Sequence, residues 1–394
     1  MEKVRFGIVG VGNMGSGHAK SFLGGKVEHG ILTAICDLKK ERMEKVRAMD
    51  GGAELATYTD YRDLFASGKV DAVIVAVPHY FHPRISMDAL AAGLHVICEK
   101  PEGVYTKQVK ELNEAAGRSD RLFTVMFNQR TNCVYRKMRE MIRNGELGEI
   151  KRVNWIITTW YRSQSYYDSG DWRATWRGEG GGVLLNQAPH QLDLWQWICG
   201  MPTALSAVCD TGKYHRIEVE DDATILARFA NGATGVFVTT TGDCPGTNRL
   251  EIDGERGKLV LEHGELHLWQ TAAPCAELIA DAPGMSPDGS CTHTVYRPDA
   301  PASAHRGILQ NFTDAVLHGT PLLAPGADGQ NELMLSNAAY LSAWQGGAWV
   351  DLPPDCALFD RLLAQRAASS AEHGGTPAGT APADGYSSRW SVNW

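Results

Sequence analysis

The fold is decided by residues 4–15, which read Val4-Arg5-Phe6-Gly7-Ile8-Val9-Gly10-Val11-Gly12-Asn13-Met14-Gly15. The first six are rich in β-branched and aromatic residues, as in a buried parallel strand. The three glycines that follow are spaced G-x-G-x-x-G, which is typical of a dinucleotide-binding turn. There the first glycine allows the bend, the second lets backbone approach a pyrophosphate, and the third lets the helix pack closely. A helix from about Asn13 would direct its N–H groups and positive dipole end at phosphates.

A second predicted strand, residues 31–36, ends on Asp37, about 20 residues after the turn. An acid at this position can bind the 2′-hydroxyl of an adenosine ribose and would repel a 2′-phosphate. This favours NAD over NADP as the cofactor, although Lys39 and Lys40 follow closely and weaken the preference. The alternative is a flexible glycine loop with a surface aspartate, which the strand context disfavours.

Length and composition restrict the class of protein. At 394 residues the chain exceeds the usual size of one hydrophobic core, so two domains are expected. A net charge of −8 argues against nucleic-acid or anionic-membrane partners, and no apolar run is long enough to span a bilayer. The early first strand leaves no room for a signal peptide. Nine cysteines without a C-x-x-C pair indicate reduced thiols in the cytoplasm, and neither a disulfide framework nor a metal site.

Residues 1–126 alternate predicted strands and helices, which predicts a doubly wound parallel sheet. Ligands of such sheets lie beyond the carboxyl ends of the strands. The residues that fall at those ends, and should line one crevice, are Gly10, Asp37, Pro78, Glu99 and Asn128.

Beyond Asn128 the pattern changes to strands joined by turns such as Asn231-Gly232 and Asp253-Gly254, which are hairpin signals. We expect residues 127–366 to form a second α/β domain on a mostly antiparallel sheet. Residues 272–303 are predicted to form a long surface loop. Residues 367–394 are predicted to be a flexible tail, whose terminal Trp390 and Trp394 should dock on the same or a neighbouring subunit.

Glu99-Lys100-Pro101 follows a predicted strand of the first domain. A lysine held there beside a cofactor would be desolvated, which lowers the pKa of its amine. It could then exchange a proton or hydrogen-bond a developing alkoxide. The alternative is an exposed lysine in an ordinary strand-to-helix turn.

A second motif runs from Gly180-Gly181-Gly182 to Asn186 and His190. Pro189 fits the first turn of a helix, so Asn186 would lie just before it. His190 is the natural general base because its unperturbed pKa is near neutrality, and Asp193 could orient its ring. The alternative is a histidine with a purely structural role at a helix N-terminus. No second histidine or cysteine lies at metal-ligand spacing.

Between these motifs, residues 155–176 are crowded with aromatic side chains and arginines. The aromatic residues are Trp155, Trp160, Tyr161, Tyr166, Tyr167, Trp172 and Trp176, and the arginines here and just beyond are Arg162, Arg173 and Arg177. Flat aromatic faces beside planar donors suit a sugar ring or glycoside. Packing between subunits is an equal alternative.

In this combination and order, the glycine turn, Glu99-Lys100-Pro101 and the triple glycine with His190 resemble the glucose-fructose oxidoreductase/inositol dehydrogenase (Gfo/Idh/MocA) family. The resemblance covers most of residues 1–355. It implies a Rossmann domain, a second domain with an open antiparallel sheet, and homodimers or homotetramers. It also implies NAD(P)-dependent oxidation of a secondary hydroxyl on a sugar, glycoside or cyclitol, with formation of a 3-keto sugar favoured.

By this resemblance Lys100, His190 and Asn186 are the expected catalytic residues, and proton transfer rests on Lys100 and His190. Asn186 falls where many members carry an aspartate, and a neutral amide cannot take a proton. The expected cofactor-binding residues are Gly10, Gly12, Asn13, Met14, Gly15, Asp37, Val77, Pro78, His82, Glu99, Lys100, Asn128, Trp172 and Arg173. The expected substrate-binding residues are Lys100, Tyr161, Arg173, Asn186 and His190.

Two alternatives to a simple dehydrogenase stay open. The first is a redox-neutral enzyme that keeps NAD bound, oxidises the sugar transiently and cleaves or epimerises it. The second is a regulator that senses NAD without chemistry, which the retention of Lys100 and His190 disfavours.

Overall fold

The computed structural model describes residues 2–170, 172–281, 284–285, 290–298 and 301–370. The chain divides into two compact units. The first contains Met1–Thr131, Ser303–Leu333 and Cys356–Asp360, and the second contains Asn132–Ala302, Met334–Asp355 and Arg361–Trp394. The expected boundaries at residues 126 and 366 therefore need correction, because two later segments return to the first unit.

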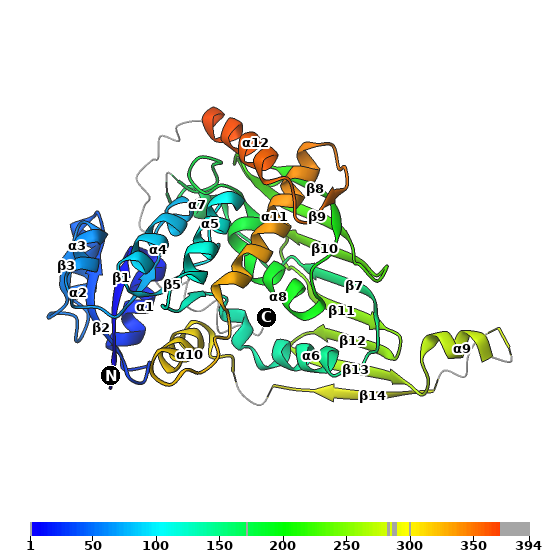
Figure 1. The fold of residues 1–394 in the computed structure, drawn as a ribbon. Helices are drawn as coiled ribbons and strands as arrows, with labels where there is room; N and C mark the ends of the chain where they lie inside the picture. Colours follow the sequence, from blue (N-terminus) through cyan, green and yellow to red (C-terminus); the bar gives the residue numbers. More distant parts are fainter. Residues whose placement is uncertain (1, 171, 282–283, 286–289, 299–300, 371–394) are drawn as a thin grey trace. The chain divides into compact units, whose positions relative to one another are not determined.

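The first unit is built on a parallel sheet of six strands in the order β3-β2-β1-β4-β5-β6 (Figure 1). This confirms the predicted doubly wound sheet. The strands are β1 Val4–Val9, β2 Gly30–Cys36, β3 Ala56–Tyr58, β4 Ala72–Val75, β5 His95–Cys98 and β6 Phe123–Val125. Its helices are α1 Asn13–Leu23, α2 Lys40–Arg47, α3 Tyr61–Ala66, α4 His82–Ala91, α5 Thr106–Gly117 and α10 Ala304–His318, with short 3-10 turns at His79–Phe81, Asn128–Thr131 and Gly326–Asp328.

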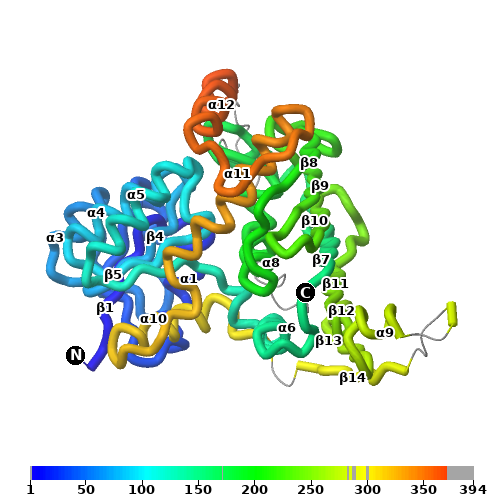
Figure 2. Tube along the Cα trace, turned by 45° about the vertical axis from the view of Figure 1, so that its right-hand side comes forward, coloured from blue at the N-terminus to red at the C-terminus, as the bar shows by residue number. Residues whose placement is uncertain are grey.

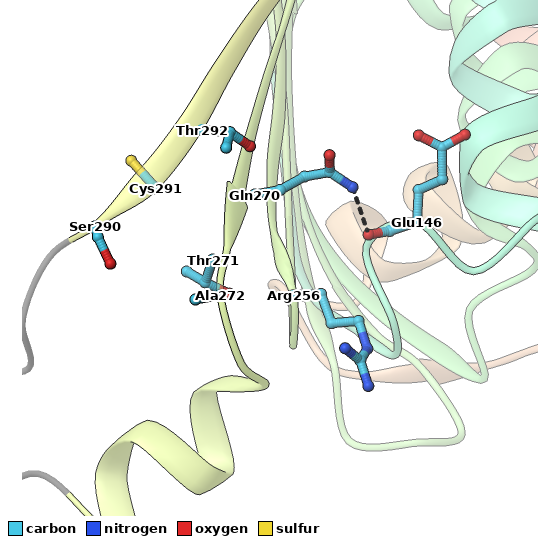
Figure 3. Close-up of a pocket in the computed structure, with 8 residues that line it drawn as sticks. All are labelled: Glu146, Arg256, Gln270, Thr271, Ala272, Ser290, Cys291 and Thr292. Carbon is cyan, nitrogen blue, oxygen red and sulfur yellow. Dashed lines mark hydrogen bonds between the residues drawn. The ribbon is translucent and has the colours of Figure 1, made fainter.

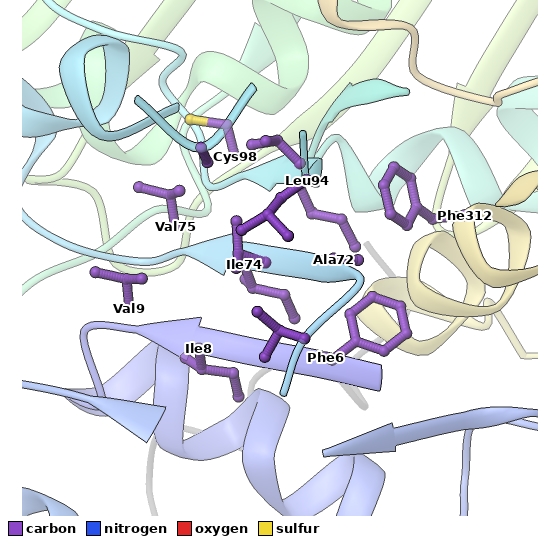
Figure 4. Close-up of a cluster of buried hydrophobic side chains, with 14 of the residues drawn as sticks. Phe6, Ile8, Val9, Ala72, Ile74, Val75, Leu94, Cys98 and Phe312 are labelled. Atoms are coloured by element: carbon purple, nitrogen blue, oxygen red, sulfur yellow. The ribbon is translucent and has the colours of Figure 1, made fainter. Parts of the chain in front are cut away.

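The core of this unit explains why α10 returns to it. Phe6 of β1 packs on Phe22 of α1, with 4.7 Å between ring centroids, and on Phe312 of α10 at 6.3 Å. Figure 4 shows Phe312 beside Phe6 and Ala72 in one cluster of buried side chains. Helix α10 thus covers apolar surface of the parallel sheet, which a linear division of the chain cannot anticipate.

The second unit is built on a nine-stranded sheet in the order β14-β13-β12-β11-β7-β10-β9-β8-β15. Neighbouring strands are antiparallel except for β7 and β10, which confirms a mostly antiparallel sheet. The strands are β7 Ile150–Ile157, β8 Ala204–Thr211, β9 Glu220–Arg228, β10 Thr234–Thr240, β11 Asn248–Gly254, β12 Gly257–Glu262, β13 Glu265–Thr271, β14 Cys291–Tyr296 and β15 Val350–Asp351. The other elements are α6 Cys133–Arg143, α7 Gln164–Tyr167, a π-turn at Val183–Gln187, α8 Pro189–Cys199 and α9 Cys275–Asp281. Two further helices, α11 Gly329–Trp344 and α12 Cys356–Ser369, belong partly to each unit.

Helices α6 and α8 lie against one face of this sheet (Figure 2). Tyr135 of α6 packs on Trp155 of β7, with 6.0 Å between ring centroids. Trp195 of α8 packs on Phe237 of β10 at 5.5 Å. These buried aromatic pairs hold α6 and α8 against the sheet, and α8 carries the second motif of the sequence.

Two local predictions are wrong. Residues 272–303 contain α9 and β14 in place of one long loop, because β14 is mostly exposed and carries no apolar alternation to reveal it. Helix α12 continues to Ser369, which shortens the predicted tail, and the expected docking of Trp390 and Trp394 lies outside the described residues.

Within the described ranges, no helix is long and apolar enough to cross a membrane.

Candidate functional site

The glycine turn of the first unit has the backbone that its sequence predicts. Gly10 has φ +90°, and a Cβ on it would lie 2.5 Å from the carbonyl oxygen of Ala76. A Cβ on Gly15 would collide with the carbonyl oxygen of Gly10. Gly12 differs, because a Cβ there would meet only Arg42 Nη1 at 3.9 Å, so the space beside it is open. Gly12 is also the N-cap of α1, which has no side-chain cap. The turn therefore leaves both the space and the N–H donors for a phosphate group.

Asp37 lies beside this turn at the end of β2. Its Oδ2 accepts a hydrogen bond from the backbone N–H of Val11 at 2.9 Å, and its Oδ1 accepts one from Lys39 at 2.9 Å. Arg42 Nη1 is 3.6 Å from Oδ2. The carboxylate is buried and held against the turn, so this half of the site fits the adenosine side of NAD. Asn13 is exposed and Met14 half-buried in the first turn of α1.

The ends of β5 and β6 carry a buried polar network. His18 Nε2 of α1 lies 2.6 Å from Glu99 Oε1, and the backbone N–H of Lys100 donates to Glu99 Oε2 at 3.2 Å. Asn128 is fully buried, and its Nδ2 lies 3.1 Å from His305 Nε2. Burial lowers the pKa of His305 to about 4, so this ring is neutral at neutral pH. The network supports the backbone on either side of Lys100.

Sequence reasoning missed His18 and His305. His18 follows Gly15 by three positions on α1, a spacing that places both on one helix face and could have marked it. His305 is almost 180 positions from Asn128 and carried no local signal.

His82, an expected cofactor-binding residue, joins two turns. Its Nδ1 lies 2.7 Å from the carbonyl oxygen of Pro101, and its Nε2 lies 2.8 Å from that of Val77. The ring is buried and both nitrogens face backbone carbonyls. His82 therefore fixes the Lys100-Pro101 turn relative to the end of β4, where Val77 is half-buried and Pro78 exposed.

The second motif of the sequence is centred on the start of α8. Asn186 lies in the π-turn just before the helix, and Pro189 is the first residue of α8, as predicted. His190 follows in the first turn and is buried. Because a π-turn intervenes, Asn186 does not share one α-helical face with His190 and Asp193. Asp193 Oδ1 accepts a hydrogen bond from Gln196 at 3.1 Å.

The triple glycine is explained by Glu220 of β9. The backbone N–H groups of Gly182 and Leu184 each donate to its carboxyl oxygens at 2.9 Å, and the Tyr340 hydroxyl donates at 2.8 Å. A Cβ on Gly181 would collide with the Tyr340 hydroxyl, and one on Gly182 with the backbone of Glu220. Burial raises the pKa of Glu220 to about 7, and these hydrogen bonds oppose the rise. Glu220 thus anchors the turn that carries Asn186 and His190.

The aromatic stretch divides into packing and surface residues. Trp155, Trp160, Tyr167 and Trp176 are buried, and Trp176 packs on Tyr340 and Trp344. Three others remain accessible: Tyr161 is 49% exposed, and Tyr166 and Trp172 are half-buried. Arg173 lies over the rings of Tyr166 and Trp172, 4.6 Å from each centroid. Only this smaller group is available to a ligand.

A separate hollow of about 450 Å³ opens beside the ends of β13 and β14 (Figure 3). Its lining includes Glu146, Arg256 and Gln270, and Gln270 donates to the carbonyl oxygen of Glu146 at 3.5 Å. None of the residues predicted from the sequence lines it. Among the described residues, no cluster of three or more His, Cys, Asp or Glu could hold a metal ion.

The buried His18–Glu99 pair predicts acid sensitivity of the first unit. Burial would raise the pKa of Glu99, but the hydrogen bond and charge of His18 hold that pKa at about 2. Because this pKa is below the unfolded value of 4.5, the stabilisation is present above pH 4.5 and is lost as pH falls toward 2. We expect Glu99→Gln to cost about 3 kcal/mol of unfolding free energy near neutrality and progressively less in acid.

Urea unfolding of both proteins across this pH range measures the difference. Glu114→Gln, on the exposed face of α5 in the same unit, is the matched control and should show no such trend. A constant difference between wild type and Glu99→Gln at all pH values would contradict the assignment.

Comparison with known proteins agrees with this geometry. Residues 4–127 match the model of the oxidoreductase family with an NAD-binding Rossmann fold, and residues 135–260 match the GFO/IDH/MocA C-terminal domain. The chain is 24% identical over 344 residues to myo-inositol 2-dehydrogenase of Thermotoga maritima, covering 86% of this chain and 96% of that protein. It is 25% identical to levoglucosan dehydrogenase of Pseudarthrobacter phenanthrenivorans, covering 90% and 99%.

Among solved structures, the chain resembles the WlbA dehydrogenase from Bordetella pertussis in complex with NADH and UDP-GlcNAcA. The TM-score is 0.74 at 26% identity, and the match covers 90% of this chain and 100% of the other. With a glycine turn fitted to NAD in one unit and both domain models matched, the chain belongs to the Gfo/Idh/MocA family of NAD-binding oxidoreductases.

Proposed function

We propose that this protein is an NAD-dependent dehydrogenase that oxidises a secondary hydroxyl of a sugar, glycoside or cyclitol, with a 3-keto sugar as the favoured product. The observation that carries the proposal is the division of chemical groups between the units. The first unit has the NAD-fitted turn together with Lys100, whose backbone the Glu99 network holds. The second has a buried histidine at a helix N-terminus beside polar side chains.

Each residue has one task in this proposal. His190 takes the proton of the substrate hydroxyl, and Lys100 hydrogen-bonds the developing alkoxide. When bound, NAD accepts the hydride from the hydroxyl-bearing carbon. Asn186 and Arg173 orient the substrate, since neither an amide nor a guanidinium takes up a proton.

The substrate class is supported by the accessible aromatic group of the second unit. Tyr161 and Trp172 offer faces that suit the apolar C–H surface of a sugar ring, and Arg173 offers planar donors for hydroxyl groups. The named activities of the inositol and levoglucosan dehydrogenases fall in the same class. The choice of C3 rests on the resemblance of Asn186-Gln187-Ala188-Pro189-His190 to members that act on glycosides.

The experiment begins by denaturing the purified protein and assaying the supernatant for NAD(H). The intact protein is then given NAD and a panel of sugars, glycosides and cyclitols, while NADH absorbance is followed. NADH release with one substrate class supports the proposal, and NMR of the product identifies the oxidised carbon. Conversion without net NADH would favour the redox-neutral alternative. Bound NAD with every substrate inert would favour the regulator.

Asp37 is expected to set the preference for NAD over NADP. In Asp37→Ser the carboxylate that repels a 2′-phosphate is gone, and Arg42, 3.6 Å away and half-exposed, could pair with that phosphate. We expect the ratio of kcat/KM for NAD to that for NADP to fall by about 10- to 100-fold. Asp50→Ser, at an exposed position of the same unit, is the control. An unchanged ratio would contradict the role of Asp37.

The same proposal includes a homodimer or homotetramer. On the face of the nine-stranded sheet away from α6 and α8, Val208 is 59% exposed, Leu226 47% and Ile156 40%. Exposed apolar side chains on one face of a large sheet favour burial against another copy. Light scattering after size exclusion should give a multiple of the chain mass, and Leu226→Arg should reduce it. A native mass of one chain would contradict the assembly.

A cytoplasmic location is also proposed. Buried Cys36 and Cys98 are free thiols, which suit a reducing compartment. If the activity is released only by cell lysis, and not by osmotic shock, the result supports a cytoplasmic location.

A further inference from the structure

Glu179, directly before the triple glycine, joins the predicted substrate-side residues into one network. Asn186 Nδ2 donates a hydrogen bond to Glu179 Oε1. The backbone N–H of Ala174 donates to Oε2 at 2.7 Å, and Arg173 Nη1 lies 3.8 Å from Oε1. Glu179 is 1% exposed. A carboxylate at this depth requires such partners, since an unpaired buried charge is strongly destabilising.

The contact with Glu179 determines the orientation of the Asn186 amide. An ionised carboxylate only accepts hydrogen bonds, so the NH₂ group of Asn186 must face Glu179. The carbonyl oxygen Oδ1 is then the amide atom that can accept from another partner, such as a substrate hydroxyl. An aspartate at position 186 would also offer an acceptor oxygen there. The pair Glu179–Asn186 thus supplies the acceptor at residue 186 and places the negative charge on residue 179.

Arg173 is fixed by the same carboxylate. Its Nη1 also donates to the Tyr166 hydroxyl at 2.8 Å, and Gln187 Nε2 donates to that hydroxyl at 3.3 Å. The guanidinium lies between two aromatic rings with a carboxylate balancing its charge. Loss of the Glu179 charge would release both the arginine and the amide.

We propose that Glu179 is the positioning residue of the substrate half-site: it holds the amide of Asn186 with its NH₂ group toward the carboxylate and its carbonyl oxygen directed away from it, and it holds Arg173 in place. This inference rests on the proposed function for its effect on turnover, whereas the Glu179–Asn186 coupling itself is independent of it.

A charge-swap cycle tests the pair. In Glu179→Gln the fixed acceptor and the arginine's partner are lost, and in Asn186→Asp two carboxylates come into contact. We expect each single variant to lower kcat/KM by about 10- to 100-fold. We also expect each to lower Tm, with NAD affinity unchanged. The double variant E179Q/N186D again has one carboxylate and one amide, so we expect its Tm to recover. We expect kcat/KM to recover only in part, because the glutamine at position 179 leaves Arg173 without its charged partner there. Glu277→Gln, exposed on α9 in the same unit, is the control.

The outcomes separate the two claims. Single-variant changes in Tm that simply add in the double variant would overturn the coupling, and this measurement needs no substrate. If Tm is coupled but kcat and KM of an active enzyme are unchanged in Glu179→Gln, Glu179 is only structural and the positioning role is overturned. If the wild type oxidises nothing while Tm is coupled, the proposed function fails and the pair remains. Should Glu179→Gln not fold, Glu179→Asp, which keeps the charge but shortens the reach, tests the positioning role by itself: it should lower kcat/KM, and unchanged kcat and KM would overturn that role.

Discussion

Replacing His190 with asparagine is expected to lower turnover by about 10²- to 10⁴-fold, the usual contribution of a general base. The side chain is 2% exposed in the first turn of α8, where Pro189 and the buried Trp195 hold the helix. Asparagine keeps a polar group there but cannot take a proton near neutrality. Because His190 belongs to the second unit and the glycine turn to the first, NAD affinity should not change.

Stopped-flow measurement of NADH formation gives the turnover, and titration calorimetry gives the NAD affinity. His293→Asn, at an exposed histidine of β14 in the same unit, should keep normal turnover. If the turnover of His190→Asn stays within about threefold of wild type, the loss is far smaller than the contribution of a general base. Another group would then have to be the base.

The second large effect is expected from the third glycine of the nucleotide turn. A Cβ on Gly15 would collide with the carbonyl oxygen of Gly10, and backbone cannot move aside as a flexible side chain can. Relieving the collision forces the start of α1 away from β1. We expect the steric strain in Gly15→Ala to be about 1–3 kcal/mol. If this strain falls on the NAD-bound turn, NAD binds about 5- to 150-fold more weakly.

Gly17 provides a matched control on the same helix. A Cβ on Gly17 would meet nothing within 4 Å. Alanine is favoured over glycine in a helix, so Gly17→Ala should raise the unfolding free energy by about 0.5–1 kcal/mol and leave NAD affinity unchanged. Thermal unfolding and calorimetry of the two variants give the comparison. Equal NAD affinity in Gly15→Ala and wild type would show that close helix packing is unnecessary for the turn.

Local sequence predicted the elements that have strong local signals. The first strand is Val4–Val9 and helix α8 is Pro189–Cys199, as predicted. The strand is recognisable because a buried parallel strand is largely apolar. The helix is recognisable because proline is common in the first turn of a helix. Strand β14 is mostly exposed and gives no such signal, so its sequence predicts a loop.

Part of the candidate site was also predicted, because some of its residues carry local signals. Gly10, Asp37, Lys100 and His190 occur in motifs whose residue types and spacing are dictated by the chemistry. Glu220, His18 and His305 were missed because each acts on a residue that is close only after folding. Glu220, for example, is 38 positions from Gly182 and accepts a hydrogen bond from its backbone N–H. Glu179 is only seven positions from Asn186, but no motif of the sequence marks their contact.

The sequence by itself determined the parallel nucleotide-binding sheet, the antiparallel second sheet and the family of the chain, because periodicity and glycine spacing are local properties of the backbone. Tertiary structure alone decided that α10 belongs to the first unit, since only the folded sheet exposes the apolar surface that Phe312 covers. It also decided the orientation of Asn186. An amide has no intrinsic preference between its two ends, and the buried carboxylate of Glu179 selects one of them.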